Sequence, residues 1–270
     1  MSYRKKHINP RIYKLKKKRS IIKMPIFWIA LICFTLIMTI LYFTLFSDRF
    51  EVKNINISGN EKNSTEQITN LISNNIKKTL VSLGGVQLST KSIFTVNSNQ
   101  IITNLLKEFP NIESVQIQKK LPQSLTVKIK ERSAVGSFCQ NQTCFLIDLN
   151  GIIFEPQNSI PDNAIIVRQN LNNKEYSAGE NAIEKNIMVN ISDIQRNLKN
   201  NFEINIKEAV MADLLKITTS ENWQIYFDPK QDVNLQIMKM NALLKTGIKM
   251  DDRKKLHYIY LQYKDRAYYQ

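Results

Sequence analysis

Few side chains in this sequence have the type and spacing that catalysis or metal binding requires. Among 270 residues the only histidines are His7 and His257, and a long charge-free stretch lies between them. We interpret His257 as a surface or half-buried residue, and Asp251-Asp252 beside Lys254-Lys255 as a solvated loop. The sequence has no glycine-rich phosphate loop and no G-x-S-x-G, H-E-x-x-H or C-x-x-C motif. We therefore expect no catalysis, cofactor, metal or small-molecule substrate.

Two cysteines lie close together in the segment FCQNQTCFL. If residues 138–139 and 144–146 are paired strands closed by Gln-Asn-Gln-Thr, Cys139 and Cys144 lie opposite each other within disulfide reach. Two unrelated reduced thiols are the alternative, and both interpretations stay open. Two cysteines without a nearby histidine do not favour a metal site.

The N-terminal part of the chain has the pattern of a membrane anchor. Ten of the fifteen net positive charges lie in residues 1–24, which contain no acid, and the 22 residues from Pro25 to Phe46 carry no charge. As a helix those residues reach about 33 Å, enough to cross the hydrocarbon core of a bilayer. The basic tail then predicts a cytoplasmic N-terminus and an extracytoplasmic remainder, where an oxidising compartment permits disulfides.

Two other kinds of segment, a signal peptide and a nucleic-acid-binding tail, share part of this pattern. A cleaved signal peptide has a shorter apolar run of about 7–15 residues and a small-x-small cleavage site, which FSDRF does not offer. A basic tail also suits nucleic acid, but directly before an apolar span the charge is better explained by membrane orientation. We expect a single-pass protein with no nucleic-acid partner.

The segment after the span begins with a strand followed by a helix. Phe50, Val52, Ile55 and Ile57 form an apolar face with one change of phase, and the strand ends at Ser58-Gly59-Asn60. Helical spacing then predicts a helix that starts near Ser64-Thr65 and closes at Gly84-Gly85. Its apolar residues are Ile68, Leu71, Ile72, Ile76 and Leu80.

A second helix and two strands complete this module. Asn97 or Ser98 is the expected helix cap, and Pro110 ends the helix. Its buried stripe is Ile101, Ile102, Leu105, Leu106 and Phe109. Two alternating segments follow around the turn KKLPQS, with Val115 and Ile117 before it and Leu125, Val127 and Ile129 after it. The order strand, helix, helix, strand, strand predicts two helices on one face of a small sheet.

Residues 50–132 resemble a POTRA domain, and the chain as a whole is similar to the bacterial FtsQ/DivIB cell-division family. The resemblance rests on Phe50-x-Val52 with Ile55, Ile57 and Gly59-Asn60, Ile93-Phe94-x-Val96-Asn97, Leu105, Phe109-Pro110-x-Ile112, Val115, Leu121-Pro122-x-x-Leu125 and Ile129-x-Glu131-Arg132. The order and spacing of these pieces behind one apolar span are specific. The resemblance divides the chain into a tail (1–24), a transmembrane helix (25–46), a POTRA domain (50–132) and a β domain (133–270).

The second half of the chain predicts a mixed sheet with two helices, which makes the fold class α+β. Residues 145–154 indicate two strands around an Asn-Gly turn, similar to a hairpin of the same family. Helices are expected over 180–201 and around 233–247, with strands near 206–211, 214–219 and 223–227. The segment LHYIYLQYKDRAYY predicts the final strand or strand pair.

The resemblance implies a non-enzymatic divisome scaffold in the cell inner membrane at the septum, which links early and late division proteins and controls septal peptidoglycan synthesis. It further implies that the terminal strand docks an FtsB/DivIC-like subunit of a complex with an FtsL-like protein. The corresponding residues here are Gln262, Tyr263, Lys264, Asp265, Arg266, Ala267, Tyr268 and Tyr269. Strand addition at a sheet edge and the anchoring role of Tyr and Arg favour the same segment.

The same residues are compatible with other interpretations. Tyr263 is equally well explained as a residue that finishes the core sheet, and Tyr260-Leu261-Gln262 replaces a frequent Asp-Leu-Arg of the family. A POTRA-containing envelope assembly or secretion factor is the alternative function, but about 140 residues after the module are too few for a long barrel. A membrane-anchored envelope hydrolase would require the catalytic residues that the sequence lacks.

Overall fold

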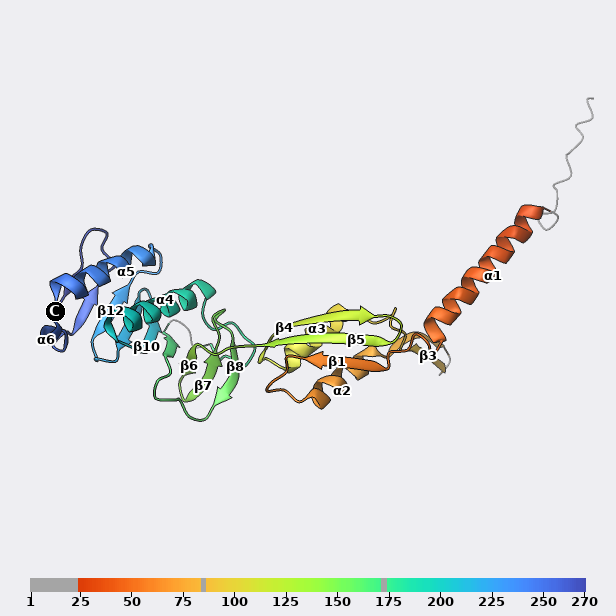
Figure 1. Cartoon of the computed structure of the whole chain (residues 1–270), viewed down its shortest axis with the longest axis horizontal. Helices are drawn as coiled ribbons and strands as arrows, with labels where there is room; N and C mark the ends of the chain where they lie inside the picture. The colour runs from red at the N-terminus through yellow and green to blue at the C-terminus, as the bar shows by residue number, and fades with distance from the viewer. Residues whose placement is uncertain (1–23, 84–85, 171–173) are drawn as a thin grey trace, which may run out of the picture. The chain divides into compact units, whose positions relative to one another are not determined.

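A computed structural model describes residues 24–83, 86–170 and 174–270 (Figure 1). The predicted basic tail therefore lies outside the described residues except for Met24, as do Gly84-Gly85. The chain forms two compact units, of which the first comprises Met1–Lys53, Ile76–Val96 and Leu121–Gln123. The second comprises Asn54–Asn75, Asn97–Lys120 and Ser124–Gln270.

The first unit contains a long helix and a β-hairpin. Helix α1 spans Pro25–Phe46, and its proline occupies the first turn, where a missing N–H costs nothing. Its length and apolar composition are sufficient to cross a membrane. Strands β2 (Lys78–Leu83) and β3 (Val86–Thr90) pair antiparallel.

This hairpin corrects the predicted end of the first helix. Helix α2 spans Thr65–Ile76 and stops there, so Leu80 lies in β2 rather than on the helix. The apolar spacing of Ile72, Ile76 and Leu80 continues past the true end of the helix. This spacing is why the sequence predicted a longer helix than α2. The β-branched and apolar residues on both sides of Gly84-Gly85 were the hairpin signal, since such a pattern around two glycines favours a tight turn.

The small sheet of the second unit has the order β1-β5-β4. Strand β1 (Asn54–Ser58) runs parallel to β5 (Ser124–Glu131), and β4 (Ile112–Lys120) runs antiparallel to β5. Helix α3 (Ser98–Glu108) lies against β4, and the predicted cap Asn97 accepts a hydrogen bond from the N–H of Gln100 at 3.2 Å. Buried side chains of both helices and the strands form the core, among them Ile68, Ile72, Ile101, Leu105, Leu125 and Val127.

The larger sheet has nine strands in the order β14-β13-β12-β11-β10-β9-β6-β7-β8. The strands are β6 (Gly136–Gln140), β7 (Thr143–Ile147), β8 (Ile153–Gln157), β9 (Ile166–Gln169), β10 (Ile206–Met211), β11 (Leu215–Thr219), β12 (Gln224–Phe227), β13 (Tyr258–Tyr260) and β14 (Tyr268–Tyr269). Parallel pairs β6/β9, β9/β10 and β12/β13 join antiparallel hairpins, so the sheet is mixed. The α+β fold class is therefore confirmed.

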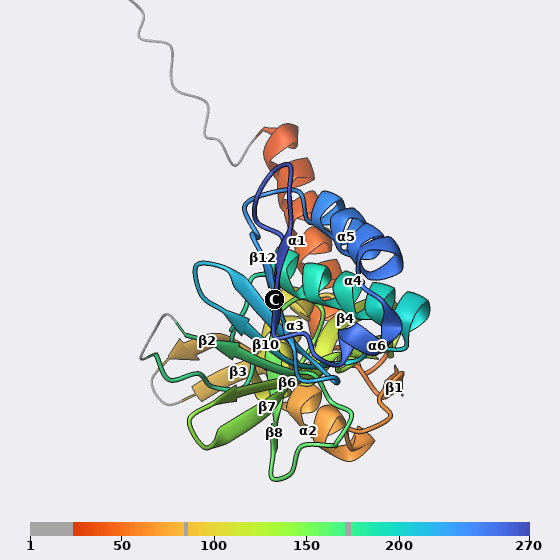
Figure 2. The same cartoon turned by 90° about the vertical axis from the view of Figure 1, so that its left-hand side faces the viewer.

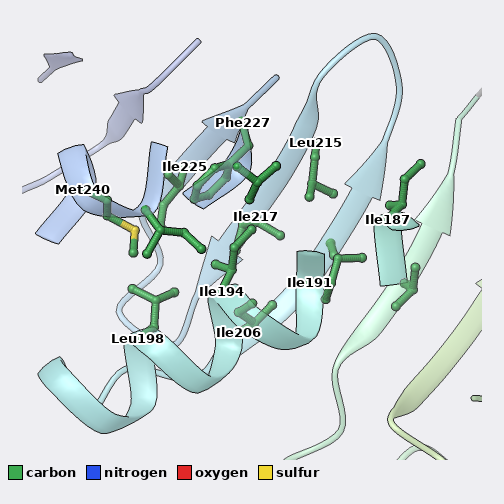
Figure 3. Packing of buried hydrophobic residues seen from close by; sticks show 14 of the residues in the cluster. Ile187, Ile191, Ile194, Leu198, Ile206, Leu215, Ile217, Ile225, Phe227 and Met240 are labelled. Atoms are coloured by element: carbon green, nitrogen blue, oxygen red, sulfur yellow. The ribbon is translucent and has the colours of Figure 1, made fainter. Parts of the chain in front are cut away.

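Two helices pack on one face of this sheet. Helix α4 (Lys185–Phe202) directs Ile187, Ile191, Ile194 and Leu198 at buried residues of the sheet, including Ile217, Ile225 and Phe227 (Figure 3). Helix α5 (Val233–Ala242) adds Met240 and continues into a π-helical turn (Leu243–Gly247), followed by the short helix α6 (Met250–Arg253). On β11, β12 and β13 the alternation of side chains leaves the other face to half-exposed polar and aromatic residues.

Helix α4 begins at Lys185, five residues after the predicted start at Glu180. The N–H groups of Ala182 and Ile183 instead donate to the carbonyl of Gly151. Asn181 forms an isolated antiparallel β-bridge with Ile152. Gly151 has φ +79°, and a Cβ at this position would lie 1.7 Å from the carbonyl oxygen of Ile183. The Asn-Gly turn thus requires glycine both for its backbone angle and for this close approach.

A buried ion pair supports the same turn. Arg132 Nη1 donates to Asp148 Oδ2 at 2.6 Å, and the side chains are only 10% and 5% exposed. Asp148 Oδ1 accepts from the N–H groups of Asn150 and Ile152, each at 2.9 Å. The neighbouring Glu131 accepts from the N–H groups of Lys62 and Asn63 before α2. The Glu131-Arg132 dipeptide therefore has a structural role in this fold.

Candidate partner-binding edge

The C-terminal strand β14 forms one edge of the nine-stranded sheet, which we call the open edge. Ile259 is paired with Tyr269, and Tyr260 with Tyr268. Gln270 exchanges backbone hydrogen bonds with Tyr258, and its carbonyl also accepts from the N–H of His257 at 2.6 Å. Because antiparallel ladders alternate, the N–H and C=O of Tyr269 point away from β13. They are in position to accept another strand.

The predicted partner-binding segment is only partly a strand. Residues 262–267 form a loop, and the strand is limited to Tyr268–Tyr269. Lys239 Nζ donates to the carbonyls of Leu261, at 2.9 Å, and Tyr263, while Gln231 Nε2 donates to the carbonyl of Gln262 at 2.8 Å. These bonds stop the strand at Tyr260 and turn the chain back toward the sheet.

The structure brings together three of the predicted residues in this segment. The rings of Tyr263 and Tyr268 meet edge to face with centroids 5.0 Å apart, and Arg266 Nη1 donates to the hydroxyl of Tyr268 at 3.4 Å. Tyr263 is 45% exposed, so it does not finish the core sheet. Lys264 and Asp265 are exposed at the tip of the loop, and Ala267 packs against the core.

Three further tyrosines lie beside the open edge and were not predicted as site residues. The rings of Tyr226 and Tyr260 stack with centroids 4.4 Å apart, and Tyr258 meets Tyr260 edge to face. Burial raises the pKa of the Tyr226 hydroxyl, and the neighbouring Tyr260 raises it further. The alternation of these tyrosines with Ile225 and Ile259 would have placed them on the face opposite the helices.

A charged cluster holds the segment that leads into β13. Arg253 donates to both carboxylate oxygens of Glu221, with the shortest distance 2.6 Å, and Trp223 Nε1 donates to Glu221 Oε2 at 3.0 Å. Burial alone would raise the pKa of Glu221, but the hydrogen bonds from Arg253 and Trp223 outweigh it and lower the pKa. The cluster therefore fixes α6 against the turn before β12 in the ionised form of Glu221.

The other edge of the sheet is β8, which we call the closed edge. Pro156 lies on this strand opposite Phe145 of β7 and has no N–H to donate to a further strand. One strand inward, Cys139 of β6 faces Cys144 of β7 with Cα atoms 4.2 Å apart, and their sulfur atoms are joined in a disulfide. Proline limits strand addition at the closed edge, whereas at the open edge the limit is the short length of β14.

The candidate residues for catalysis or metal binding lie apart from one another in the part of the chain that the structure describes. Within residues 24–83, 86–170 and 174–270, no group of three or more His, Cys, Asp or Glu side chains is arranged to hold a metal ion. His257 is exposed, and its backbone carbonyl accepts from Gln224. Asp251 and Asp252 lie in α6 rather than in the predicted loop. What the site offers is backbone hydrogen bonding and exposed tyrosines.

The fold and this edge define a POTRA-bearing protein with an N-terminal apolar helix and a C-terminal mixed-sheet domain. A family model described as "POTRA domain, FtsQ-type" matches residues 74–132. A cell division protein DivIB of Clostridium tetani is 27% identical over 72% of this chain and 70% of its own length. A DivIB of Clostridium botulinum strain Hall is 26% identical over 86% of this chain and 88% of its own length. These matches support the assignment of the chain to the FtsQ/DivIB family.

Proposed function

We propose that this protein is a non-enzymatic scaffold of the division septum that captures a partner subunit at the open edge. The relatives named as DivIB cell-division proteins support a role in cell division. The apolar helix α1 fits a single-pass membrane protein, and we infer a cytoplasmic N-terminus with the folded units outside the cytoplasm. The POTRA and β domains would then receive other divisome proteins, through which the scaffold controls septal peptidoglycan synthesis.

The observation that carries this proposal is the outward direction of the Tyr269 backbone on a two-residue terminal strand. An extended segment of an FtsB/DivIC-like subunit, in complex with an FtsL-like protein, would pair with Tyr269 and lengthen the sheet. Such a short strand supplies few backbone bonds. The exposed rings of Tyr263, Tyr268 and Tyr269 would therefore supply much of the contact area.

One substitution tests the backbone part of this proposal. Tyr269→Pro removes the outward N–H but leaves the Gln270 bonds to Tyr258, and proline is tolerated on edge strands when its nitrogen faces outward. Loss of one backbone hydrogen bond costs about 1 kcal/mol, so we expect its removal to lower affinity for the FtsB/DivIC-like partner about fivefold. Co-purification and titration with the full chain measure this.

Tyr269→Val is the matched control, because it also removes the ring but keeps the N–H. We expect it to bind the partner more tightly than Tyr269→Pro, and both variants to have the thermal unfolding midpoint of the unsubstituted chain. Equal affinity of the two variants would rule out strand addition at Tyr269.

A cellular experiment tests the division role itself. Depletion should give filamentous cells with unseparated septa. A defect confined to outer-membrane barrel assembly would instead support the alternative of a POTRA-containing assembly factor.

A further inference from the structure

Two hydroxyl groups attach the β2–β3 hairpin to the end of α1. Ser92 Oγ donates to the carbonyl of Thr44 at 2.7 Å, and Thr90 Oγ1 donates to the carbonyl of Leu45. The last carbonyls of a helix have no partner within the helix, so these bonds satisfy groups that would otherwise require water. The base of the hairpin is therefore fixed to the last turn of the helix.

Further bonds join the remaining parts of the first unit at the same level. The N–H of Ile93 donates to the carbonyl of Phe50 at 2.8 Å, and Lys91 forms an ion pair with Glu51 at 3.4 Å. Gln123 Nε2 donates to the carbonyl of Asp48 at 2.9 Å, and its own carbonyl accepts from Lys53. We call the described residues of 47–53, 76–96 and 121–123 the collar.

The collar lies where a membrane would end. The 22 residues of α1 extend about 33 Å, close to the thickness of a hydrocarbon core, so Thr44 and Leu45 fall at its boundary. Leu88 is two strand residues from Thr90, a backbone distance of about 7 Å. Within this unit the hairpin is nearly end-on in Figure 1 and extends sideways in Figure 2, so it runs across the axis of α1. A hairpin in this direction would lie along a membrane surface.

The exposed side chains of the collar suit such a surface. Leu88, Phe94 and Leu121 are 47%, 49% and 63% exposed. The sequence of the collar contains five cations and only two carboxylates, Asp48 and Glu51. The cations are Arg49, Lys53, Lys77, Lys78 and Lys91, and all five are exposed. Apolar side chains flanked by lysine and arginine are typical of segments that lie at the headgroups of anionic lipids.

The collar also contains a polar hollow next to the end of α1. It has a volume of about 200 Å³ and lies between the end of α1 and β3. Ser47, Glu51, Ser89 and Lys91 contribute hydroxyl, carboxylate and ammonium groups to its lining. Groups of this kind can hydrogen-bond to a headgroup at the level where the helix leaves the hydrocarbon.

We propose that the collar binds the surface of an anionic phospholipid bilayer. Leu88 and Leu121 enter the interface, and Lys77 and Lys78 contact lipid phosphates. Continuity with the apolar helix and the excess of positive charge favour lipid over a second protein as the occupant. This inference rests on the proposed membrane anchoring of α1, and it gives the protein a second contact with the bilayer.

Fluorescence quenching of the full chain in nanodiscs of phosphatidylcholine and phosphatidylglycerol tests this inference. A polarity-sensitive dye is attached at Leu88→Cys in a Cys33→Ser background, and the Cys33→Ser chain alone gives the labelling background of Cys139 and Cys144. The matched control is Leu235→Cys, because Leu235 is 54% exposed in the second unit. We expect spin-labelled lipid to quench the dye at position 88 at least several-fold more than at position 235.

A dye on native Cys33, which lies within α1, distinguishes the proposed membrane anchoring from the proposed lipid binding by the collar. If lipid quenches a dye on Cys33 but position 88 is quenched only by aqueous iodide, the anchoring stands and the collar proposal is overturned. If lipid quenches neither, both proposals are overturned. The double substitution Lys77→Glu/Lys78→Glu should reduce lipid quenching at position 88 several-fold, whereas Lys230→Glu in the second unit should not. Equal effects would overturn the role given to the two lysines.

Discussion

The two edges of the nine-stranded sheet are stabilised in different ways. The closed edge has Pro156 on its outer strand, a disulfide one strand inward, and a turn fixed by Gly151 and the buried Arg132–Asp148 pair. The open edge is a strand of two residues with exposed tyrosines, reached by a loop held through its carbonyls. Proteins usually protect both edges of a sheet against strand addition. The open edge has no proline and directs the N–H and C=O of Tyr269 outward, so it is the natural candidate for binding.

The largest expected effect is on the support of the closed edge. Asp148→Ala leaves Arg132 buried without its carboxylate and removes the acceptor for Asn150 and Ile152. Breaking a buried pair in this way costs about 3–5 kcal/mol of unfolding free energy. Denaturant unfolding measures the loss. Asp148→Asn, which keeps an oxygen acceptor, should lose less, and an unchanged midpoint for Asp148→Ala would contradict the structural role.

Removal of the disulfide should have the next largest effect. Cys139 and Cys144 are five residues apart, and opening so short a loop is expected to cost about 2 kcal/mol in the chain-entropy model. The Cys139→Ala/Cys144→Ala chain should unfold at a lower temperature while its affinity for the partner stays unchanged. If loss of the disulfide weakened partner capture instead, the two edges would not be independent.

A smaller, pH-dependent effect is expected next to the open edge. The pKa of Glu221 is lowered in the folded state from its ordinary value of 4.5, so its ionised form stabilises the fold above that pH. Hydrogen bonds to a charged group are worth about 1.5 kcal/mol or more, and Glu221→Gln should lose roughly that at neutral pH. This difference should shrink as the pH falls through the lowered pKa. A constant difference between pH 7 and pH 3 in thermal unfolding would exclude the ionised pair as its cause.

The smallest effect on stability is expected from Pro156→Val, which restores an N–H to the closed edge. We expect unfolding free energy to change by less than about 1 kcal/mol, with a concentration-dependent rise in self-association. Light scattering after size-exclusion chromatography detects this. A chain that remains monomeric at high concentration would show that Pro156 alone does not close the edge.

The sequence predicted most strands and helices of both sheets because their alternation and helical spacing are regular. Asn97, one of the two predicted caps, and Asn150-Gly151 as a hairpin turn were also correct, since both act through local backbone geometry. The β2–β3 hairpin was missed because Leu80 continues the helical spacing of Ile72 and Ile76. The start of α4 was misplaced because a distant carbonyl, that of Gly151, accepts the N–H groups of Ala182 and Ile183 and keeps both residues outside the helix.

The candidate site was predictable in position but not in form. Tyrosines and a terminal segment indicated an edge, and the structure places Tyr268–Tyr269 there. The loop of residues 262–267 depends on Lys239 and Gln231, which lie more than twenty residues earlier in the chain. No local pattern encodes such contacts. The stacking of Tyr226 on Tyr260 likewise depends on the parallel register of β12 and β13.

Site-specific photo-crosslinking at both edges in dividing cells tests the central claim most directly. A photoreactive amino acid replaces Tyr269 on the open edge or Glu155 on the closed edge, both of which are exposed. We predict a covalent adduct with an FtsB/DivIC-like subunit from position 269 and none from position 155. An adduct from position 155 in the absence of one from position 269 would contradict the account.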